Sequence, residues 1–536
     1  MKLSALEAEL KKRATRAFAL DQNQAAAFSL CAPPPHIHSD ISIAWPIAAA
    51  KLLKKPPLKI AEELKMALGP DFEAGIVAPG FLNINFENDF LFEALKDIVS
   101  GPAYFKNPKR AAQKINIEFV SANPTGPLHL ASGRAATLGD SLARILRFLG
   151  AGVISEYYVN NMGRQVELLG SSLKARLKGS EPPEDGYKGS YLKDIAAVLP
   201  PEASGWTEIQ FSEFAVAQML KLHKADMKAF GVEFDRWFLE SELHEADAPR
   251  KALEALKNLG MTYEKEGAVW FGSASKMNSD DKDRVLVKSD GRNTYFLNDI
   301  SYHLDKYDRG FNSLIDIWGA DHHGHVPRME AAVSALGKDR GGFKVIIHQM
   351  VLLKRGEILV KMSKREGDFV SLKELVEEAG SDACRFFFAM RGPNTHLIFD
   401  IDLAKKRSNE NPVYYVQYVH ARICSIFANA AEKGVDVKAG FEPAEITFNP
   451  EERALALKLL WFEGTLETCA ADFSPHYLTT YLTELSALFH SFYDRHKVLD
   501  PEEPQTTAMR LFLLKAVKAV ISDGLCLLGI SSPEKM

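Results

Sequence analysis

The feature that most constrains the fold of this chain is a short apolar strand, a loop rich in proline and glycine, and a helix, in that order. Residues 115–120 read INIEFV, the loop reads SANPTGPLHLASG, and residues 134–150 carry apolar side chains at helical spacing. A second apolar segment, GVISEYYV, follows at residues 152–159. Such an order begins a doubly wound parallel sheet, in which ligands bind at the carboxyl ends of the strands. We therefore predict a multidomain α/β protein whose main domain is a Rossmann-like, doubly wound parallel sheet.

Length and pattern divide the chain into three parts. A chain of 536 residues is too long for one hydrophobic core. We expect an N-terminal α/β domain at residues 1–108, an α/β body at 109–400 and an all-helical bundle at 401–536, where strand signals stop. Within the body, an insertion is expected at about 172–215, loosely folded over 178–210 because proline and glycine are frequent there. The α/β pattern then resumes in the segments WFLE, AVWFGS, RVLVKSDG, TYFLND, SLIDIWG and KVIIHQM.

Charge, cysteine content and hydropathy argue against several classes of protein. The formal net charge is −5, which disfavours a general nucleic-acid coating protein but not one that docks a single folded RNA. The five cysteines are scattered without zinc-knuckle or redox-pair spacing, so we expect no zinc and a reducing compartment. No stretch approaches the ~18 apolar residues of a membrane span, and the charged N-terminus is not a signal peptide. These patterns predict a cytoplasmic protein with no membrane partner.

The loop before residue 134 is the first candidate site. His129 lies just before a helix, at the carboxyl end of a predicted parallel strand. Helix N-termini at that edge attract phosphate, and a histidine there can donate to a triphosphate and stabilise the charge that develops during transfer. Taken alone, the pattern is equally consistent with a histidine that caps its own loop.

A lysine-rich run at residues 361–365 is the second candidate site. It reads Lys-Met-Ser-Lys-Arg and follows the hairpin-like segment VLLKRGEILV. Two lysines three apart on a loop can reach a pyrophosphate leaving group as point charges. A lone pair of lysines is usually solvated surface. By contrast, a Lys-Met-Ser-Lys run that follows an α/β sheet carrying the first loop is a combination specific enough to indicate a site.

In these segments the chain resembles the arginyl-tRNA synthetases, a class I family whose signatures are His-Ile-Gly-His and Lys-Met-Ser-Lys. The likeness covers nearly the whole chain, and the segments that carry it are EFVSANPTGPLH, EYYVNNMGRQVELLGSSL, WGADHHGHVPRM, SNENPVYYVQYVHARI and GLCLLGISSPEKM. The segment HSDISIAWPIAAAKLLKKPPLKIAEEL also resembles the extra domain with which this family touches the tRNA elbow. The resemblance implies ATP-dependent ligation of L-arginine to its tRNA through arginyl-adenylate, with a first step that needs bound tRNA.

The resemblance also assigns ATP to the two candidate loops. His129, Lys361 and Lys364 would hold the phosphates, with Mg²⁺ shared between them. The residues expected to contact ATP are Pro127, His129, Ala131, Ser132, Met362, Ser363 and Lys364. Those expected to act in catalysis are His129, Ser132, Lys361 and Lys364.

One of the two signatures departs from the family. The following Gly133 and Arg134 fix the register, so HLAS stands at 129–132 in place of His-Ile-Gly-His. Ala131 replaces the glycine against which the family packs adenine, and a new methyl in a tight site costs ~1–3 kcal/mol. Ser132 replaces the second imidazole, and losing one transition-state donor costs ~10²–10³ in rate, although a hydroxyl can still donate. A compensating neighbour, a slow enzyme and an inactive paralogue that only binds tRNA all stay open.

The segment TYFLNDISYHL carries the candidate amino-acid site. We expect it to be a strand that turns into a helix capped by Asn298, which places Asp299 in the first helical turn. A carboxylate that faces a guanidinium can form a bidentate pair that lysine cannot match. The resemblance implies that arginine is bound by Asn123, Tyr295, Asp299 and His322. Without it, Asp299 would be an ordinary residue of a helix start.

A histidine-rich run at 321–325 has the composition of a metal site, with Asp321 beside three histidines. The run resembles a substrate-facing loop that holds no metal in the family, so we expect no metal ligand here. His36 and His38 are likewise expected to be loop residues.

Basic and aromatic side chains at the two ends of the chain are the candidate tRNA contacts. Lysine and arginine suit phosphates, and aromatic rings can stack on unpaired anticodon bases. Such runs are more often a solvated helix face or a packed core, and we expect Tyr415 and Val419 to be buried. The candidates are Lys12, Arg13, Lys55, Tyr414, Tyr418 and Arg422. The predicted partners are arginine tRNA, L-arginine and ATP, bound by a monomer; a synthetase for another amino acid is the remaining alternative.

Overall fold

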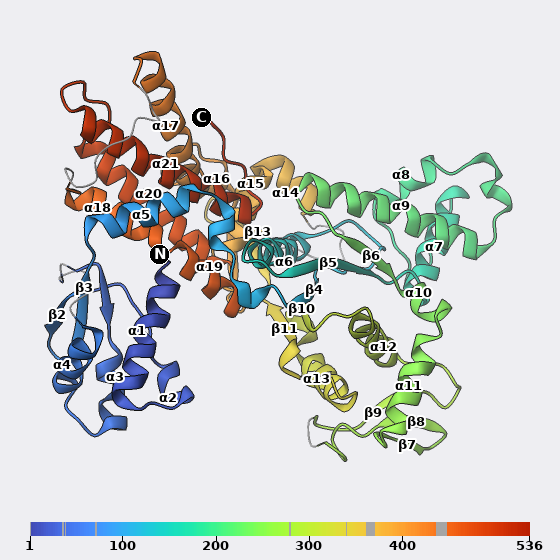
Figure 1. Ribbon diagram of the computed structural model, residues 1–536. Coiled ribbons are helices and arrows are strands. Elements are labelled where there is room, and N and C mark those ends of the chain that lie inside the picture. Colours follow the sequence, from blue (N-terminus) through green and yellow to red (C-terminus); the bar gives the residue numbers. More distant parts are fainter. Residues whose placement is uncertain are drawn as a thin grey trace.

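The computed structural model describes residues 2–34, 37, 39–69, 72–277, 280–338, 340–360, 370–435 and 447–536. Its N-terminal domain contains a three-stranded antiparallel sheet in the order β1-β3-β2, against which α3 and α4 pack (Figure 1). Leucines three or four apart, such as Leu6 and Leu10 of α1, are buried, as an amphipathic helix requires. The elements are α1 (Leu3–Phe18), α2 (Gln22–Ala26), β1 (Ile41–Ile43), α3 (Trp45–Leu53), α4 (Pro57–Leu68), β2 (Glu73–Val77), β3 (Phe81–Asn85) and α5 (Asn88–Val99).

Five parallel strands form the central sheet, in the order β11-β10-β4-β5-β6. The chain winds from β4 outward through β5 to β6, then returns to the other side of β4 for β10 and β11. The winding direction therefore reverses between β4 and β10, where such sheets leave a ligand crevice at their carboxyl ends. The predicted doubly wound parallel sheet is confirmed. Its elements are β4 (Lys114–Glu118), α6 (Leu130–Phe148), β5 (Gly152–Val159), β6 (Arg236–Leu239), β10 (Ser313–Gly319), α13 (Val326–Ala335) and β11 (Phe343–His348).

Between β6 and β10 the chain forms a separate three-stranded antiparallel sheet, β7-β8-β9, and the helix α12. The prediction that TYFLND is a strand leading into a helix capped by Asn298 is wrong. Thr294 caps α12 by accepting from the amide of Leu297, so Tyr295 is the first helical residue and Asp299 lies in the second turn. The aromatic residues suggested a strand, but the cap and the buried helical face override that propensity. The elements are α10 (Glu240–Glu245), α11 (Ala248–Asn258), β7 (Thr262–Lys265), β8 (Ala268–Phe271), β9 (Arg284–Val287) and α12 (Tyr295–Asp308).

A helical insertion separates β5 from β6 and projects from the body (Figure 1). The prediction that 178–210 is loosely folded is wrong, because Leu192 and Ile195 are buried there in an apolar core shared with Phe211 and Met219. Prolines and glycines flank this short helix, and its few apolar residues give only a weak helical pattern in the sequence. The insertion consists of α7 (Arg164–Leu177), α8 (Tyr191–Ala197), the 3₁₀ turn Pro201–Gly205 and α9 (Glu208–Ala229).

A small sheet and a helical bundle complete the chain. The strands of the small sheet lie in the order β13-β12-β14, and α14 and α15 lead from it toward the bundle. In the bundle, α5 packs against α18 and α21 (Figure 1). The helical C-terminal domain and the N-terminal α/β domain are thus confirmed, whereas their boundary residues stay predictions. The elements are β12 (Val351–Arg355), β13 (Ile358–Val360), α14 (Leu372–Ala379), α15 (Ser381–Ala389), β14 (Leu397–Asp400), α16 (Ile401–Lys405), α17 (Pro412–Glu432), α18 (Pro450–Leu460), α19 (Phe462–Ala471), α20 (His476–Arg495) and α21 (Pro504–Leu527).

Charged side chains join the three parts. Arg453 of α18 pairs with the buried carboxylate of Asp40 in the N-terminal domain, at 2.5 Å. Arg385 of α15 is fully buried and pairs with Asp140 of α6 at 2.5 Å. The same guanidinium donates to the Leu528 carbonyl at the end of α21. The bundle is therefore fixed against the helix that begins at the first candidate loop.

Candidate active site

The loop after β4 is strained and held in place by its neighbours. Val120 and Ser121 have φ angles of 71° and 39°, a region that a β-branched residue rarely adopts. Such residues cost about 1–3 kcal/mol each and persist only where the surroundings determine them. Here Ser121 donates to Glu118 at 2.8 Å and accepts from the amide of Tyr158 at 3.1 Å. The loop that leads to the first signature is thus preformed.

Helix α6 begins directly at the altered signature. His129 is the N-cap residue in extended conformation, and Leu130 is the first helical residue. Ala131 is partly exposed at this end, whereas Ser132 is buried with 5% of its surface accessible. The position of the second imidazole in the family is therefore occupied by a small side chain on the buried face of the helix.

The segment after β13 meets the same helix start. His129 forms an antiparallel bridge with Ser371, and the Leu372 amide donates to the Leu128 carbonyl at 2.9 Å. Lys361, Met362, Ser363 and Lys364 lie outside the described residues. Ser371, which stands seven residues after Lys364 in the sequence, is adjacent to His129 in space.

Two buried nitrogen-bearing side chains, Arg134 and His348, lie near the same helix start and were missed by sequence reasoning. Arg134 donates to the carbonyls of Gln349, Gly392 and Thr395 at 2.8–2.9 Å, and burial lowers its pKa to about 10. Burial, followed by the charges of Arg134 and His129, lowers the pKa of His348 at the end of β11 to about 4. His348 is therefore a neutral imidazole beside the signature. It follows an apolar strand and gave no signal beyond its place at a strand end.

The amino-acid candidates line a separate part of this sheet edge. A cavity of about 350 Å³ is lined by Asp299, Asp321, His322, Gly324, His325 and Arg328. His325 Nε2 lies 2.9 Å from Asp299 Oδ2, which fixes the carboxylate at the cavity wall. The structure thus brings Asp299 and His322 together.

Asn123 and Tyr295 approach each other through the start of α7. Asn123 Nδ2 donates to Gln165 at 2.7 Å. The Tyr295 hydroxyl lies 3.8 Å from the position that a Cβ atom on Gly163 would take, and Tyr295 is 67% exposed. Both side chains therefore border residues 163–165, from the β4 loop on one side and from α12 on the other.

Glu240 is a second carboxylate beside Asp299 and was not among the predicted residues. It accepts from Asn298 Nδ2 at 2.8 Å. Burial and the charge of Asp299 raise the pKa of Glu240, although the Asn298 hydrogen bond opposes them. The signal that could have found it is its place directly after the strand segment WFL, at the carboxyl edge of the predicted sheet.

Beneath Asp299, a buried charged cluster fixes α12 to the sheet. Lys306 Nζ lies 2.6 Å from Glu118 of β4 and 3.0 Å from Asp316 of β10. Burial opposes the charge on Lys306, but the surrounding carboxylates outweigh it and raise the lysine pKa. His303 bridges Asp316, at 2.7 Å, and the backbone carbonyl of Asp299, also at 2.7 Å. In the sequence these charges look like a solvated helix face.

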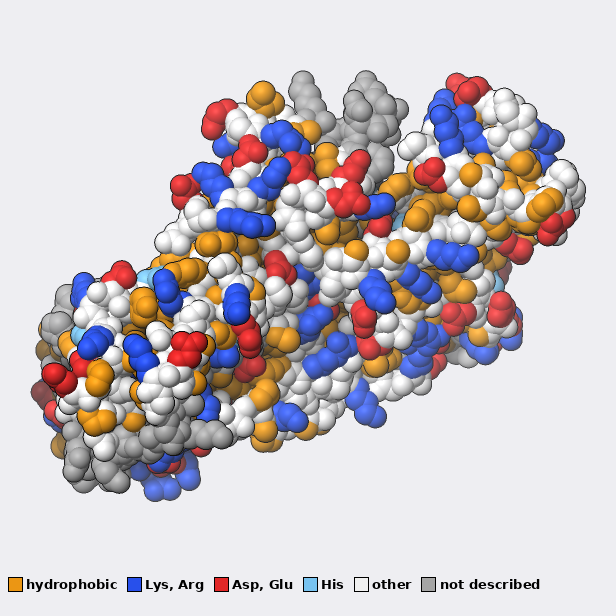
Figure 2. Space-filling view, turned by 90° about the horizontal axis from the view of Figure 1, so that it is seen from above, with side chains coloured by type: hydrophobic (Ala, Val, Ile, Leu, Met, Phe, Trp, Pro, Cys, Tyr) orange, Lys and Arg blue, Asp and Glu red, His pale blue; other side chains and the backbone are white. Residues whose placement is uncertain are grey.

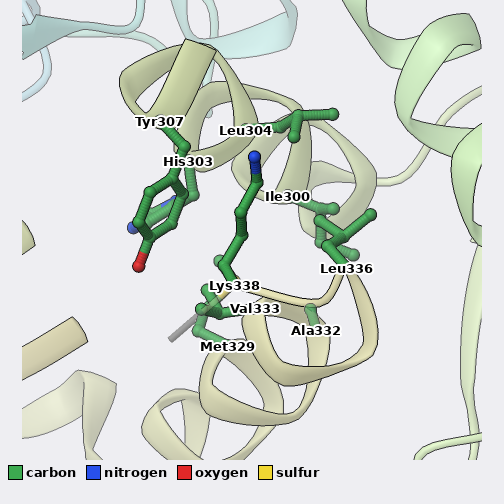
Figure 3. A pocket seen from close by; sticks show the side chains of 9 residues that line it. All are labelled: Ile300, His303, Leu304, Tyr307, Met329, Ala332, Val333, Leu336 and Lys338. Atoms are coloured by element: carbon green, nitrogen blue, oxygen red, sulfur yellow. The ribbon is translucent and has the colours of Figure 1, made fainter. Parts of the chain in front are cut away.

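A void between α12 and α13 is not a substrate site. Figure 3 shows mostly apolar side chains lining it, among them Ile300, Met329 and Leu336. It has no room for a water molecule. The void reflects imperfect packing between α12 and α13.

The tRNA candidates fall into two distant groups, and several already have intramolecular partners. Lys55 pairs with Glu63 at 2.7 Å and Arg13 with Glu9 at 3.0 Å, whereas Lys12 is exposed. In the last domain, the Arg422 guanidinium lies over the rings of Tyr418 and Tyr493, and Tyr414 is partly buried. Val419 is buried as predicted, but Tyr415 is only partly buried because its ring lies against His490 at the surface of the bundle. Figure 2 shows lysine and arginine side chains interleaved with acidic ones.

The described residues contain no cluster of three histidine, cysteine or acidic side chains that could hold a metal ion. His36 and His38 lie outside the described part of the chain. Among the helices that the structure describes, none is long and apolar enough to cross a membrane.

Three parts of the chain match known protein families. Residues 4–86 match the arginyl tRNA synthetase N terminal domain, residues 95–194 match the catalytic domain of class I (R) tRNA synthetases, and residues 416–536 match the DALR anticodon binding domain. The arginine–tRNA ligase of Elusimicrobium minutum is 54% identical over 509 residues, which cover 94% of both chains. That of Thermotoga maritima is 43% identical over 95% of this chain and 96% of its own.

Solved structures give the same result. A putative arginyl-tRNA synthetase from Campylobacter jejuni superposes with a TM-score of 0.75 at 36% identity, over 84% of this chain and 100% of the other. The Thermus thermophilus arginyl-tRNA synthetase superposes over the full length of both chains with a TM-score of 0.80, at 24% identity. The resemblance seen in the sequence is confirmed: this chain belongs to the arginyl-tRNA synthetases, a family of the class I aminoacyl-tRNA synthetases.

Proposed function

We propose that in this arginine–tRNA ligase Asp299 binds the substrate guanidinium and the helix start at HLAS receives ATP. Membership of the family supports the activity, with ATP, arginine and tRNA as substrates. The observation that carries the residue assignment is the cavity at Asp299. It opens at the same sheet edge as the start of α6, so the two substrates can meet there.

The reaction has two displacements. The arginine carboxylate oxygen attacks the α-phosphorus of ATP, the bond from the α-phosphorus to the bridging oxygen breaks, and pyrophosphate leaves. The terminal ribose hydroxyl of tRNA then attacks the arginyl carbonyl and AMP leaves. Neither step needs a protein nucleophile, so the protein acts by positioning the reactants and neutralising charge.

We propose that the guanidinium of arginine binds Asp299, with Glu240 as a second carboxylate behind it. Two carboxylates match the five donors of a guanidinium and its charge. Tyr295, Asn123 and His322 would close the site around the rest of the substrate. The first two border residues 163–165, and His322 lines the cavity with Asp299. This arrangement disfavours a neutral side chain, which could not compensate the charge of the carboxylates.

For ATP, we assign the phosphates to His129 with Lys361 and Lys364, and the nucleoside to Pro127, Ala131, Ser132, Met362 and Ser363. The bridge between His129 and Ser371 supports a shared role for the two loops. The buried Ser132 would contribute a hydroxyl in place of the second imidazole. Nothing in the comparisons supports the alternative of an inactive paralogue.

Mg²⁺ is proposed to enter with ATP. This ion keeps several waters and is bound mainly through substrate phosphates, with one or two carboxylates. This departs from the sequence expectation that the 321–325 run supplies no metal ligand: Asp321, with its side chain 82% exposed at the cavity rim, would supply a carboxylate to the ATP-bound ion. When bound, the ion would neutralise charge on the phosphates. The monomeric state, the cytoplasmic location and the tRNA contacts at Lys12, Arg13, Lys55, Tyr414, Tyr418 and Arg422 stay predictions.

Amino-acid-dependent exchange of pyrophosphate into ATP tests the proposal. The purified protein is incubated with tRNA and each amino acid in turn. Exchange with arginine alone is expected, and Lys361→Ala should slow it far more than it weakens arginine binding. No exchange, or exchange with another amino acid, would overturn the assignment.

A further inference from the structure

The loop between β4 and α6 is held from below by three side chains that belong to other elements. Tyr157 of β5 donates to the Ala122 carbonyl at 2.9 Å and accepts from the Ala122 amide at 3.1 Å. Tyr191 of α8 donates to the Thr125 carbonyl at 2.6 Å. His223 of α9 lies with Nε2 2.8 Å from the Gly126 carbonyl. The insertion helices therefore contact the loop that carries Asn123 and leads to His129.

His223 ties both halves of this loop together. Its Nδ1 lies 3.1 Å from the Tyr157 hydroxyl, and the side chain is fully buried. Because the Gly126 oxygen can only accept, Nε2 must carry the proton. Burial lowers the pKa of His223, which favours the neutral ring, so Nδ1 is an acceptor that shares the single Tyr157 hydroxyl proton with the Ala122 carbonyl. One hydrogen-bonded chain thus runs from the Ala122 amide through Tyr157 and His223 to the Gly126 carbonyl.

The insertion core fixes the position of His223. Helices α7 and α9 approach so closely that a Cβ atom on Gly170 would lie 2.1 Å from Ser212 Oγ. Met219, one turn before His223, is buried in the apolar core of the insertion. The helix that presents the histidine therefore cannot shift without opening this core.

We propose that His223 is a positioning residue for arginyl-adenylate formation. It holds the strained loop in the conformation that aims Asn123 and His129 at the substrates, and so couples the insertion to catalysis. Only the kinetic test of this inference depends on the proposed function. A displacement of about 1 Å in such a loop can cost on the order of 10²-fold in rate.

The kinetic test compares His223→Leu, His223→Gln and Met219→Ala with the unchanged protein in pyrophosphate exchange. His223→Leu should lower kcat/KM for ATP by about 10²-fold while KM for tRNA changes less than about two-fold. His223→Gln should recover most of the loss, because an amide offers one acceptor and one donor as the neutral ring does. Met219→Ala is the matched control, a buried change on the same helix whose side chain belongs to the insertion core.

A second readout does not depend on activity. Hydrogen exchange at the backbone amides of 121–127 should accelerate at least ten-fold in His223→Leu and stay near normal in His223→Gln. In Met219→Ala the acceleration should fall on α7–α9 instead. If His223→Leu and Met219→Ala lose activity in the same proportion for every substrate, or if the loop amides are unchanged, the positioning role is wrong. Absence of arginine-dependent exchange in the unchanged protein would count against the proposed function, and the amide measurement would still decide this inference.

Discussion

Helices α6 and α12 both begin at the carboxyl edge of the central sheet, yet different forces hold them there. Helix α6 is buried along nearly its whole length and uses glycines for close approach. A Cβ atom on Gly139 would lie 2.2 Å from the Phe119 ring. Helix α12 is instead fixed by Tyr302, His303 and Lys306, whose polar atoms reach carboxylates of three strands.

The difference follows from what each helix presents. The nucleotide side needs a helix N-terminus at a fixed height above the sheet, which close apolar packing provides. The arginine side needs one carboxylate aimed at a cavity, so rotation about the helix axis must be fixed. Charged partners with one geometry do this, at the cost of desolvation. Changes of volume should therefore damage α6, and changes of charge should damage α12.

The largest expected effect is on the charged cluster of α12. Lys306→Met leaves Glu118 and Asp316 buried without their cation, so the free energy of unfolding should fall by about 3–5 kcal/mol. Lys338→Met is the control, because that lysine is 31% exposed and lies 3.9 Å from Asp308. Urea denaturation of the two variants measures the difference. Similar losses in both would show that burial of the charges does not matter.

A charge change at the cavity should affect catalysis more than folding. Asp299→Asn should lower kcat/KM for arginine by roughly 10²- to 10³-fold, because one partner of a charged pair is lost in the bound state. Asp308→Asn on the same helix is the control, since its side chain is 67% exposed. Steady-state pyrophosphate exchange checks both. An equal effect in the control would remove Asp299 from the site.

A volume change should damage α6 by a smaller amount. Gly139→Ala places a methyl against Phe119 and should lower the free energy of unfolding by about 1–3 kcal/mol. Gly464→Ala is the matched helical control, because its nearest neighbour, Trp461, is 3.9 Å away. The control should be neutral or slightly stabilising, since alanine favours a helix. Thermal unfolding of both proteins distinguishes overpacking from a general intolerance of alanine.

The smallest expected effect on stability is at a partly exposed ion pair. Glu467 lies 2.5 Å from Arg110 and is 28% exposed. Burial alone would raise the pKa of Glu467, but hydrogen bonds from Arg110 and Asn107 outweigh it and lower the pKa. A depressed carboxyl pKa contributes stability at neutral pH that is lost as pH falls through the folded value. Glu467→Gln should therefore cost about 0.5–1 kcal/mol at pH 7 and almost nothing near pH 3, by urea denaturation.

The parts of the fold that the sequence predicts best are those with long, local patterns. The strand at 115–120, the helix after it and the C-terminal helices follow from regular apolar spacing. The start of α12 was missed because Tyr295 and Phe296 favour strands locally, whereas Thr294 and the buried face decide the outcome. Helix α8 was missed because its two buried residues, Leu192 and Ile195, belong to an apolar core that is built mainly from α7 and α9.

The site shows the same division. His129 and Asp299 could be proposed from the sequence, because the segments that carry them resemble those of the family. The residues that hold them in place, such as His223, Glu240 and His348, are far apart in sequence and share no motif. Their roles depend on distances between elements, which no local pattern encodes. Supporting residues therefore had to come from the structure.

The most direct test of the account compares arginine with citrulline, which has the same shape but a neutral urea group. Specificity constants for both are measured in tRNA-dependent pyrophosphate exchange by the unchanged protein. If Asp299 and Glu240 read positive charge, the constant for arginine should exceed that for citrulline by on the order of 10³ or more. Comparable constants for the two amino acids would contradict a charge-reading site on α12.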